Sequence, residues 1–237
     1  MSAYQTTLLG RTRVADGTMA FRFEKPKHFA FKAGQYVGLT ISDPEHGAST
    51  HTFSIASSPL DEDLLVTTRM RNTLFKQALA VLPIGSEAQI DGPMGSFHLH
   101  NNMAKPAVFL AGGIGIAPFL SMLAYATREK FGHPMHLFYA NRQLKDAAFI
   151  EALWKLERAN PRFRFVPTLT RLDNNGGGWK GKIGHISSEM IRTHVGVLPG
   201  PIYYIAGPPA MVAAANQTLA DAGVNEDDIR TEEFAGY

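Results

Sequence analysis

The chain has 237 residues, of which 45% are hydrophobic and 19% are charged, and 23 Lys and Arg residues against 21 Asp and Glu residues give a formal net charge of +2. This length and apolar content predict one large or two small domains with buried cores rather than a disordered chain. The absence of cysteine excludes disulfides, thiolate zinc sites and cysteine-held iron–sulfur clusters, and so small a positive charge without basic clusters does not indicate nucleic-acid binding.

The first hundred residues have the pattern of a small antiparallel β-barrel. Short runs of β-branched or aromatic residues alternate with Gly, Pro, Asp and Ser, as strands alternate with turns. These runs cover residues 6–14, 18–24, 35–41, 51–56, 64–69 and 87–90. One helix is predicted at 73–82, where apolar residues fall on one helical face and Pro83 and Gly85 follow.

Strands and helices alternate in the second part of the chain. Strands are predicted at 107–111, 135–141, 164–170, 202–206 and 228–234, and helices at 116–130, 147–158, 189–193 and 209–222. This alternation is typical of parallel βαβ units. The sequence therefore predicts a two-domain β plus α/β fold: an antiparallel β-barrel with one helix over residues 1–102, and a parallel-sheet nucleotide-binding domain over residues 103–237.

The uncharged segment 106–127 is long enough to be considered as a membrane span. Three glycines and Pro118 divide it into a short strand and an apolar helix, so we predict no membrane span. The first residues contain no basic region that leads into an apolar stretch, so no signal peptide is expected. The expected location is cytoplasmic.

A glycine-rich turn joins the first strand of the α/β half to its first helix. Gly112, Gly113 and Gly115 end the strand and open the helix, where backbone N–H groups can approach a diphosphate at the positive helix end. The spacing departs from Gly-x-Gly-x-x-Gly because Pro118 occupies the third glycine position. Taken alone, the turn suits either a dinucleotide site or tight packing.

A second cluster lies at another strand-to-helix junction and contains Gly207, Pro208, Pro209 and Met211. Because ligands gather at the carboxyl ends of parallel strands, this junction and the glycine-rich turn are expected to face one crevice. Alone, the two prolines also suit the start of a helix.

A third cluster lies in the β half at residues 51–59. Alternation places His51, Phe53 and Ile55 on one strand face and Thr52 and Ser54 on the other. It is followed by the segment 69–73, which leads into the predicted helix. By itself, the third cluster is an ordinary strand.

In this order, the clusters resemble the ferredoxin–NADP reductase superfamily of flavoproteins. The family's flavin motif Arg-x-Tyr-Ser corresponds to residues 51–54, and its Gly-Gly-x-Gly-x-x-Pro turn corresponds to 112–118. Its Cys-Gly-Pro-Pro-x-Met segment corresponds to 206–211, and its Gly-Pro-x-Gly-x-Phe turn to 92–97. The likeness covers nearly the whole chain.

The resemblance implies an FAD-binding barrel followed by an NAD(P)-binding α/β domain, with hydride passing between nicotinamide and flavin in the crevice. It implies that Phe53 flanks the isoalloxazine, that Ser54 forms a hydrogen bond near flavin N5, and that the segment 69–73 holds the pyrophosphate. The chemistry belongs to the cofactors, and the protein supplies distance and electrostatics. The cofactor-binding residues implied here are His51, Thr52, Phe53, Ser54, Ile55, Arg69, Met70, Arg71, Thr73, Gly112, Gly113, Gly115, Ile116, Gly207, Pro208, Pro209 and Met211.

The chain departs from the family's motifs at three positions. His51 replaces the arginine that neutralises the pyrophosphate, and a histidine with an ordinary pKa of ~6.5 is mostly neutral at pH 7. We therefore expect Arg69 or Arg71 to carry that charge. Phe53 replaces a tyrosine, and Ala206 replaces the cysteine beside the nicotinamide.

Further polar residues follow the strand predicted at 135–141. Asn141 and Arg142 occupy the place where the adenosine ribose of a dinucleotide usually lies, and with Lys145 they suit a 2′-phosphate, which predicts a preference for NADPH. Simple solvation is the alternative for Lys145. Asp146 is expected to cap the next helix.

Other charged residues are given no role in binding. The acidic stretches 226–228 and 232–233 are interpreted as a solvated turn between a helix and a strand. His98 and His100 have no third metal ligand at a suitable spacing, so no metal site is predicted.

Two aromatic residues stand near the C-terminal end of the sequence. Family members often end in an aromatic residue that covers the flavin face where nicotinamide stacks. By this resemblance, Phe234 is expected to be the gating residue, catalytic together with Ser54, and Tyr237 is expected to be an outer lid or adenine contact. A frayed chain end is the alternative for Tyr237.

The sequence thus predicts a stand-alone NAD(P)H-dependent flavin oxidoreductase with FAD and NAD(P)H as cofactors. Without cysteine ligands for an iron–sulfur cluster, its electron acceptor is expected to be a separate protein or small molecule. No nucleic-acid partner is expected. The alternative is a non-catalytic NAD(P)H-sensing or regulatory subunit of a larger complex.

Overall fold

The N-terminal half of the protein consists of antiparallel strands. The structure, a computed structural model, describes residues 3–43, 47–171 and 179–234. The sheet order is β4-β3-β6-β1-β2-β5. It closes into a barrel where Ile55, directly after β4, bridges to Val66 of β5. The strands are β1 (Ala3–Ala15), β2 (Thr18–Glu24), β3 (Tyr36–Asp43), β4 (Gly47–Ser54), β5 (Asp63–Arg69) and β6 (Glu87–Met94).

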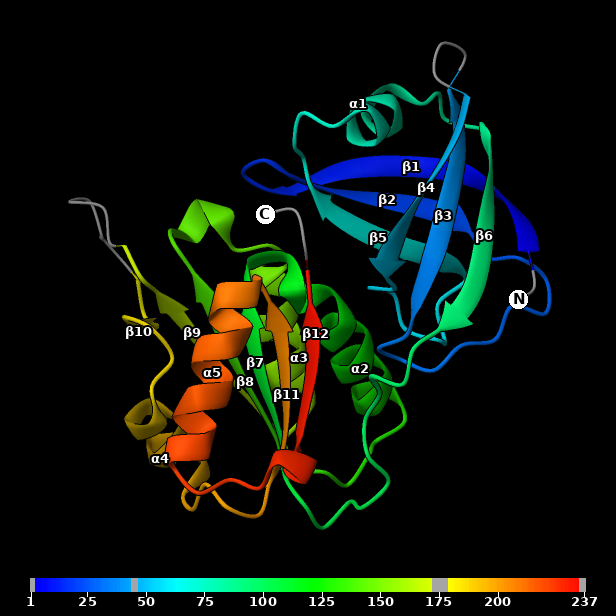
Figure 1. Ribbon diagram of the computed structural model, residues 1–237. Coiled ribbons are helices and arrows are strands. Elements are labelled where there is room, and N and C mark those ends of the chain that lie inside the picture. Colours follow the sequence, from blue (N-terminus) through cyan, green and yellow to red (C-terminus); the bar gives the residue numbers. More distant parts are fainter. Residues whose placement is uncertain (1–2, 44–46, 172–178, 235–237) are drawn as a thin grey trace.

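Helix α1 (Leu74–Val81) lies at one end of this barrel (Figure 1). Thr73 begins the helix, because its side chain accepts a hydrogen bond from the Lys76 N–H (3.4 Å). Pro83 follows the C-cap residue Leu82. Phe75 and Leu79 are buried in the barrel core, which also contains Phe21, Phe23, Leu39 and Ile41.

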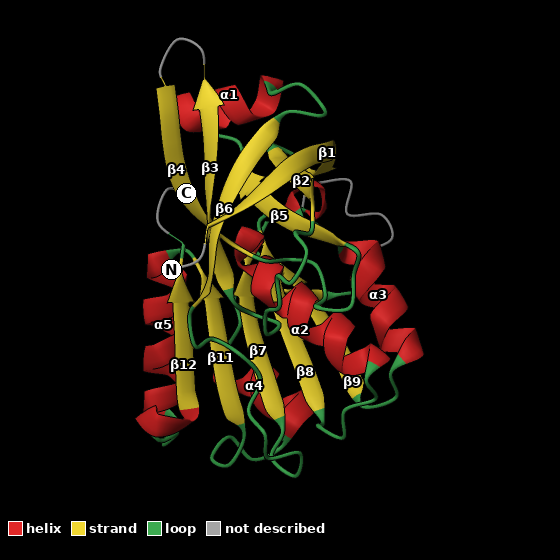
Figure 2. Cartoon of the chain, turned by 90° about the vertical axis from the view of Figure 1, so that its right-hand side faces the viewer, coloured by secondary structure: helices red, strands yellow, loops and turns green. Residues whose placement is uncertain are grey.

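Parallel strands build the second sheet, in the order β10-β9-β8-β7-β11-β12. Their carboxyl ends lie toward the barrel, as the arrowheads of β12, β11, β7 and β8 show in Figure 2. The strands are β7 (Ala107–Gly112), β8 (Met135–Asn141), β9 (Phe163–Leu169), β10 (Lys182–Ile183), β11 (Ile202–Gly207) and β12 (Ile229–Glu233).

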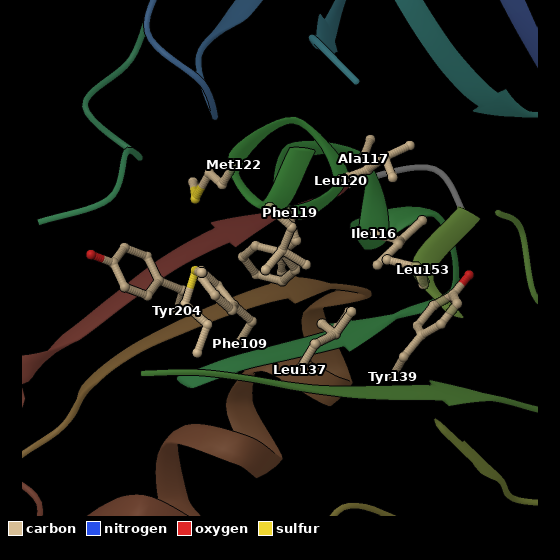
Figure 3. Packing of buried hydrophobic residues seen from close by; sticks show 14 of the residues in the cluster. Phe109, Ile116, Ala117, Phe119, Leu120, Met122, Leu137, Tyr139, Leu153 and Tyr204 are labelled. Carbon is tan, nitrogen blue, oxygen red and sulfur yellow. The ribbon is translucent and has the colours of Figure 1, made fainter. Parts of the chain in front are cut away.

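Helices cover both faces of the parallel sheet. Helices α2 (Ile116–Arg128) and α3 (Ile150–Ala159) pack on one face, and α4 (Ser188–Val195) and α5 (Pro209–Asp221) pack on the other (Figure 2). Rings fill the core beneath α2 (Figure 3): Phe109 lies 5.1 Å from Phe119 and 5.2 Å from Tyr204 between ring centroids. Pro118 is tolerated because it lies in the first turn of α2, where an N–H has no partner within the helix.

The architecture confirms the predicted two-domain β plus α/β fold. The helix predicted at 147–158 begins later, at Ile150, because Phe149 has a positive φ of 59° that a helix cannot continue. Asp146 does not cap that helix, since its carboxylate accepts from the Gln143 N–H (3.1 Å) and caps the 3₁₀ turn Leu144–Asp146. The short strand β10 was not predicted from the sequence. None of the helices in the described part of the chain has the length and hydropathy needed to cross a membrane.

Candidate active site between the two sheets

A first pocket, of about 90 Å³, lies where the barrel faces the parallel sheet. His51 and Phe53 share one face of β4, as alternation predicts, and their ring centroids lie 4.4 and 5.8 Å from that of Phe75 in α1. Ile114 and Phe234 reach the pocket from the α/β half. The described residues that line it are His51, Thr52, Phe53, Ser54, Thr67, Thr68, Arg69, Lys76, Ile114 and Phe234.

The hydroxyl of Thr67 is an unused hydrogen-bonding group in this pocket. Thr67 is only 6% exposed, and its Oγ1 atom has no hydrogen-bond partner among the described residues. A buried hydroxyl without a partner is unusual in a folded protein. The first pocket therefore has an open polar contact for a ligand, which fits a flavin better than a purely apolar molecule.

A carboxyl group joins the two halves at the end of β4. Ser54 Oγ donates a hydrogen bond to Glu232 Oε1 (2.5 Å), although the two residues are 178 positions apart. The other oxygen, Oε2, is buried without a partner among the described residues. Burial raises the pKa of Glu232, and the hydrogen bond from Ser54 offsets part of this rise.

The interpretation of residues 232–233 as solvated is therefore wrong for Glu232, whereas Glu233 is exposed. Arg230, Glu232 and Phe234 alternate on one face of the last strand segment, and that face points toward the barrel. Alternation along the strand could have indicated that Glu232 faces the barrel, but two adjacent acidic residues have the pattern of an exposed turn.

A second pocket, of about 320 Å³, adjoins the first at the carboxyl ends of β7, β8 and β11. It brings together the glycine-rich turn, the Gly207–Met211 cluster and basic residues from both halves of the chain. Its lining is Arg69, Arg71, Gly112, Gly113, Ala140, Asn141, Arg142, Asp146, Thr170, His185, Pro208 and Met211. Among the described lining residues, three arginines face a single acid, Asp146, so the pocket suits an anionic ligand such as a dinucleotide.

Two glycines allow close contact around this second pocket. A Cβ atom on Gly112 would lie 3.1 Å from Pro208 Cδ and 3.2 Å from Met211 Sδ. A Cβ atom on Gly115 would lie 2.2 Å from the backbone oxygen of Ala206. The glycine-rich turn is thus pressed against β11 and the Pro208 turn. This packing places the turn at the start of α2, the end of a helix that favours anions such as phosphate.

Asn141 and Arg142 lie at the far side of the second pocket, where β8 ends. Arg142 O accepts a hydrogen bond from the Arg171 N–H (2.9 Å), so the ends of β8 and β9 are joined. Asn141 is 6% exposed, and its side-chain Oδ1 atom has no partner among the described residues. These groups suit a polar part of a nucleotide, such as a ribose.

A third cavity, of about 600 Å³, lies beside Glu232. Its lining is Tyr36, Gly95, Ser96, Phe97, His98, Arg230, Thr231 and Glu232. The Arg230 guanidinium donates to His98 O (2.8 Å) and to the Tyr204 hydroxyl (3.3 Å). Glu232 thus stands between this open cavity and the first pocket, where its partner Ser54 lies.

The remaining residues predicted for cofactor binding lie near the pockets but do not line them. Ile55 and Ile116 are fully buried, Thr73 caps α1, Met70 packs on the barrel core, and Pro209 is the first residue of α5. Gly115 and Gly207 contact neighbouring backbone. Tyr237 lies outside the described residues. Site residues that the sequence analysis missed are Thr67, Thr68, Lys76, Ile114, Thr170, His185 and Glu232.

Comparisons with known proteins agree with this geometry. The model of an FAD-binding domain matches residues 6–117, and the model of an oxidoreductase NAD-binding domain matches residues 109–217. The chain therefore belongs to the ferredoxin–NADP reductase superfamily of flavoproteins, as its motifs indicated. It consists of an FAD-binding domain followed by an NAD-binding domain.

Curated proteins similar to this chain include a phenol hydroxylase protein and the reductase component of a monooxygenase. The chain is 27% identical to the phenol hydroxylase P5 protein of Acinetobacter pittii, over 98% of this chain and 65% of that protein. It is 29% identical to the propane 2-monooxygenase reductase component of a Gordonia species, over 89% of this chain and 61% of that protein. The chain thus spans less than two thirds of the length of both relatives.

Solved structures share the fold over nearly the whole chain. A ferredoxin NADP+ reductase from Neisseria gonorrhoeae, with bound FAD and NADP, has a TM-score of 0.83 and 24% identity, covering 98% of this chain and 99% of that one. A cytochrome P450 reductase from Amycolatopsis has a TM-score of 0.84 and 24% identity, covering 98% of this chain and 70% of that one.

Proposed function

We propose that the chain is an NAD(P)H-dependent flavin oxidoreductase that passes hydride from nicotinamide to FAD and delivers electrons to a separate acceptor. One observation carries the proposal: the first and second pockets share a wall. Arg69 lines both, while Ile114 of the glycine-rich turn lines the first and its neighbour Gly113 lines the second. Two nucleotides bound in these pockets would meet at this shared wall.

The protein's own groups have distinct roles in this proposal. The second pocket binds the dinucleotide through its arginines and the N–H groups of the glycine-rich turn. Phe234 covers the first pocket from the α/β side, and its N–H is held by Gly207 O (3.0 Å). Bound FAD supplies the two-electron chemistry, because no side chain of this site can accept a hydride.

Glu232 and Ser54 are proposed to transfer the proton that accompanies hydride transfer to the flavin. The raised pKa of Glu232 favours a carboxyl group that holds a proton, and Ser54 Oγ is in direct contact with it. The third cavity links Glu232 to solvent, so a proton can reach the pair without crossing the nicotinamide pocket. General acid–base groups of this kind contribute about 10²- to 10⁴-fold to a rate.

The electron acceptor is proposed to approach at the third cavity. This cavity shares no described lining residue with the first or second pocket, so an acceptor there would not compete with nicotinamide. The similarity to the propane 2-monooxygenase reductase component and to the phenol hydroxylase P5 protein favours an oxygenase system as the acceptor. The chain contains no cysteine that could hold an intervening iron–sulfur cluster.

Two finer assignments belong to the same proposal. We place the domain boundary between residues 102 and 103, supported by the end of β6 at Met94 and the start of β7 at Ala107. The cytoplasmic location stays a prediction, which fractionation of the source cells would test.

The experiment is an anaerobic titration of the purified protein with NADH and with NADPH, monitored by flavin absorbance. We expect a yellow protein that is bleached by a stoichiometric amount of reduced nicotinamide. A Glu232→Gln variant should deliver electrons to an artificial acceptor about 10²-fold more slowly, and the exposed neighbour variant Glu233→Gln should match the wild type. A colourless protein that binds nicotinamide would instead support the regulatory-subunit alternative.

A further inference from the structure

Basic side chains gather where the first and second pockets adjoin. Arg69, Arg71 and Lys76 form no salt bridge with any described residue. The first turn of α1 contains no acid. Neighbouring positive charges repel each other, and a bound anion between them offsets this repulsion. A negatively charged ligand from outside the chain would therefore be favoured at this cluster.

His51 itself does not supply a permanent charge here. Its ring packs on Phe75 with centroids 4.4 Å apart. Burial and the charge of Lys76 both lower the pKa of His51, so the imidazole is neutral at pH 7. The family's arginine position is thus occupied by a packed, uncharged ring.

The three remaining cations differ in the pocket that they face. Arg69 lines both pockets, and Arg71 lines only the second. Lys76 lines only the first, where it is the cation that acts on His51. Arg69 and Arg71 therefore face the dinucleotide pocket, whereas Lys76 is confined to the flavin pocket.

Local structure prepares Lys76 for an anion. It lies in the first turn of α1, where the positive end of the helix dipole favours negative charge. The unpartnered Thr67 hydroxyl, in a residue only 6% exposed, lies in the same pocket and offers a second hydrogen bond. Burial and the charge of Arg71 lower the pKa of Lys76, as expected for a cation that lacks a counterion.

We propose that Lys76 is the phosphate-binding cation of the flavin pocket and takes the role that the family's motif gives to arginine at position 51. This inference rests on the proposed function, because it requires the flavin dinucleotide to bind in the first pocket. The group that Lys76 binds is the diphosphate of FAD and not its isoalloxazine ring. A lysine on a flexible stem binds phosphate as a point charge and does not need the fixed geometry of an arginine.

The test measures binding of FAD and of riboflavin to the apoprotein by fluorescence titration. Riboflavin lacks phosphate, so it reports the isoalloxazine contacts alone. Lys76→Met should weaken FAD binding by about 10- to 100-fold and leave riboflavin binding unchanged. Lys76→Arg should retain FAD binding, and Lys155→Met, on the exposed surface of α3, should match the wild type for both ligands.

A rescue variant tests whether Lys76 replaces the motif's arginine. His51→Arg combined with Lys76→Met should regain most of the lost FAD affinity. Thermal melting of the apoprotein separates binding from folding. Lys76→Met should melt at the same temperature as the wild type or higher, because the change removes repulsion from Arg71.

The outcomes separate the two claims. If the wild type binds no FAD, the proposed function fails. If it binds FAD and Lys76→Met binds FAD equally well, the function stands and the Lys76 assignment fails, which returns the charge to Arg69 or Arg71. Equal losses for FAD and riboflavin, a lower melting temperature of the apoprotein, or no rescue by His51→Arg would each overturn the assignment.

Discussion

Gly115→Ala tests how closely the glycine-rich turn must approach β11. The backbone of Gly115, at φ −59° and ψ −5°, suits any residue, so only the added methyl group matters. That Cβ atom would lie 2.2 Å from Ala206 O, 2.4 Å from Ala206 C and 2.7 Å from Gly207 N. Ordinary contact begins near 3.4 Å, so the turn must move by about 1 Å.

The free-energy cost follows from what the methyl group meets. Overpacking typically costs about 1–3 kcal/mol. Here the obstacle is backbone of β11, which is paired with β7 on one side and with β12 on the other and cannot yield as a side chain would. We therefore expect a loss near the upper end, about 3 kcal/mol in the free energy of unfolding.

The same displacement reaches the second pocket, because Gly112 and Gly113 precede Gly115 in the turn. A misplacement of about 1 Å at a reacting site can cost about 10²-fold in rate. Urea unfolding measures the stability, and steady-state kinetics measures kcat/KM for the nicotinamide. Gly132→Ala is the control, since its Cβ would lie 3.5 Å from Met103 Sδ, an ordinary contact. Wild-type stability and kinetics in Gly115→Ala would refute this reasoning.

Three further changes probe the site. Phe234→Ala should tighten nicotinamide binding by about two- to tenfold, because stacking of the ring over the first pocket is worth about 0.5–1.5 kcal/mol. Weaker nicotinamide binding in a titration, or a larger effect from deleting residues 235–237, would contradict the gating role of Phe234. Arg142→Ala should lower the NADPH-to-NADH ratio of kcat/KM by tenfold or more, as expected for the loss of a charge-assisted hydrogen bond worth about 1.5–3 kcal/mol. An unchanged ratio would show that Arg142 does not contact the 2′-phosphate. Because burial raises the pKa of Glu232, the folded state holds its proton more tightly, so wild-type stability should fall as pH rises from about 4.3 through the raised pKa. In urea unfolding, Glu232→Gln should then be more stable than the wild type above that pH window and equally stable below it, with Glu233→Gln as the control. If the stability of Glu232→Gln and of the wild type changed with pH in parallel, the carboxyl group of Glu232 would not be a buried group that holds a proton.

Much of the fold could be predicted because its signals are local. The bounds of β2 and β8 agree residue for residue with the prediction, since apolar alternation and flanking turn residues mark both ends. The start of α1 follows from Thr73 as the cap, and its end follows from Pro83. The start of α3 could not be predicted, because the left-handed conformation of Phe149 is imposed by its surroundings and not by its own preference.

The candidate site was predictable where a motif or the end of a parallel strand marks it. Ser54, Gly112 and Pro208 stand in motifs whose residue types and spacing indicate nucleotide binding, and all three lie at the pockets or on their walls. Glu232 and Lys76 stand in no such motif, and each has the charge of an ordinary surface residue. Their importance follows from burial and from neighbours, which a single sequence does not report.

Except for β10, the sequence alone determined the order of strands and helices, the two-domain class and the family, because periodicity, turn residues and motif spacing act over a few positions of the chain. Only the tertiary structure decided which remote groups meet. It joined Ser54 to Glu232 across 178 positions, set Lys76 beside His51, and pressed Gly115 against β11. The physical reason is that hydrogen bonds, charge interactions and steric overlap depend on distances in space, and the packing of the barrel against the parallel sheet sets those distances.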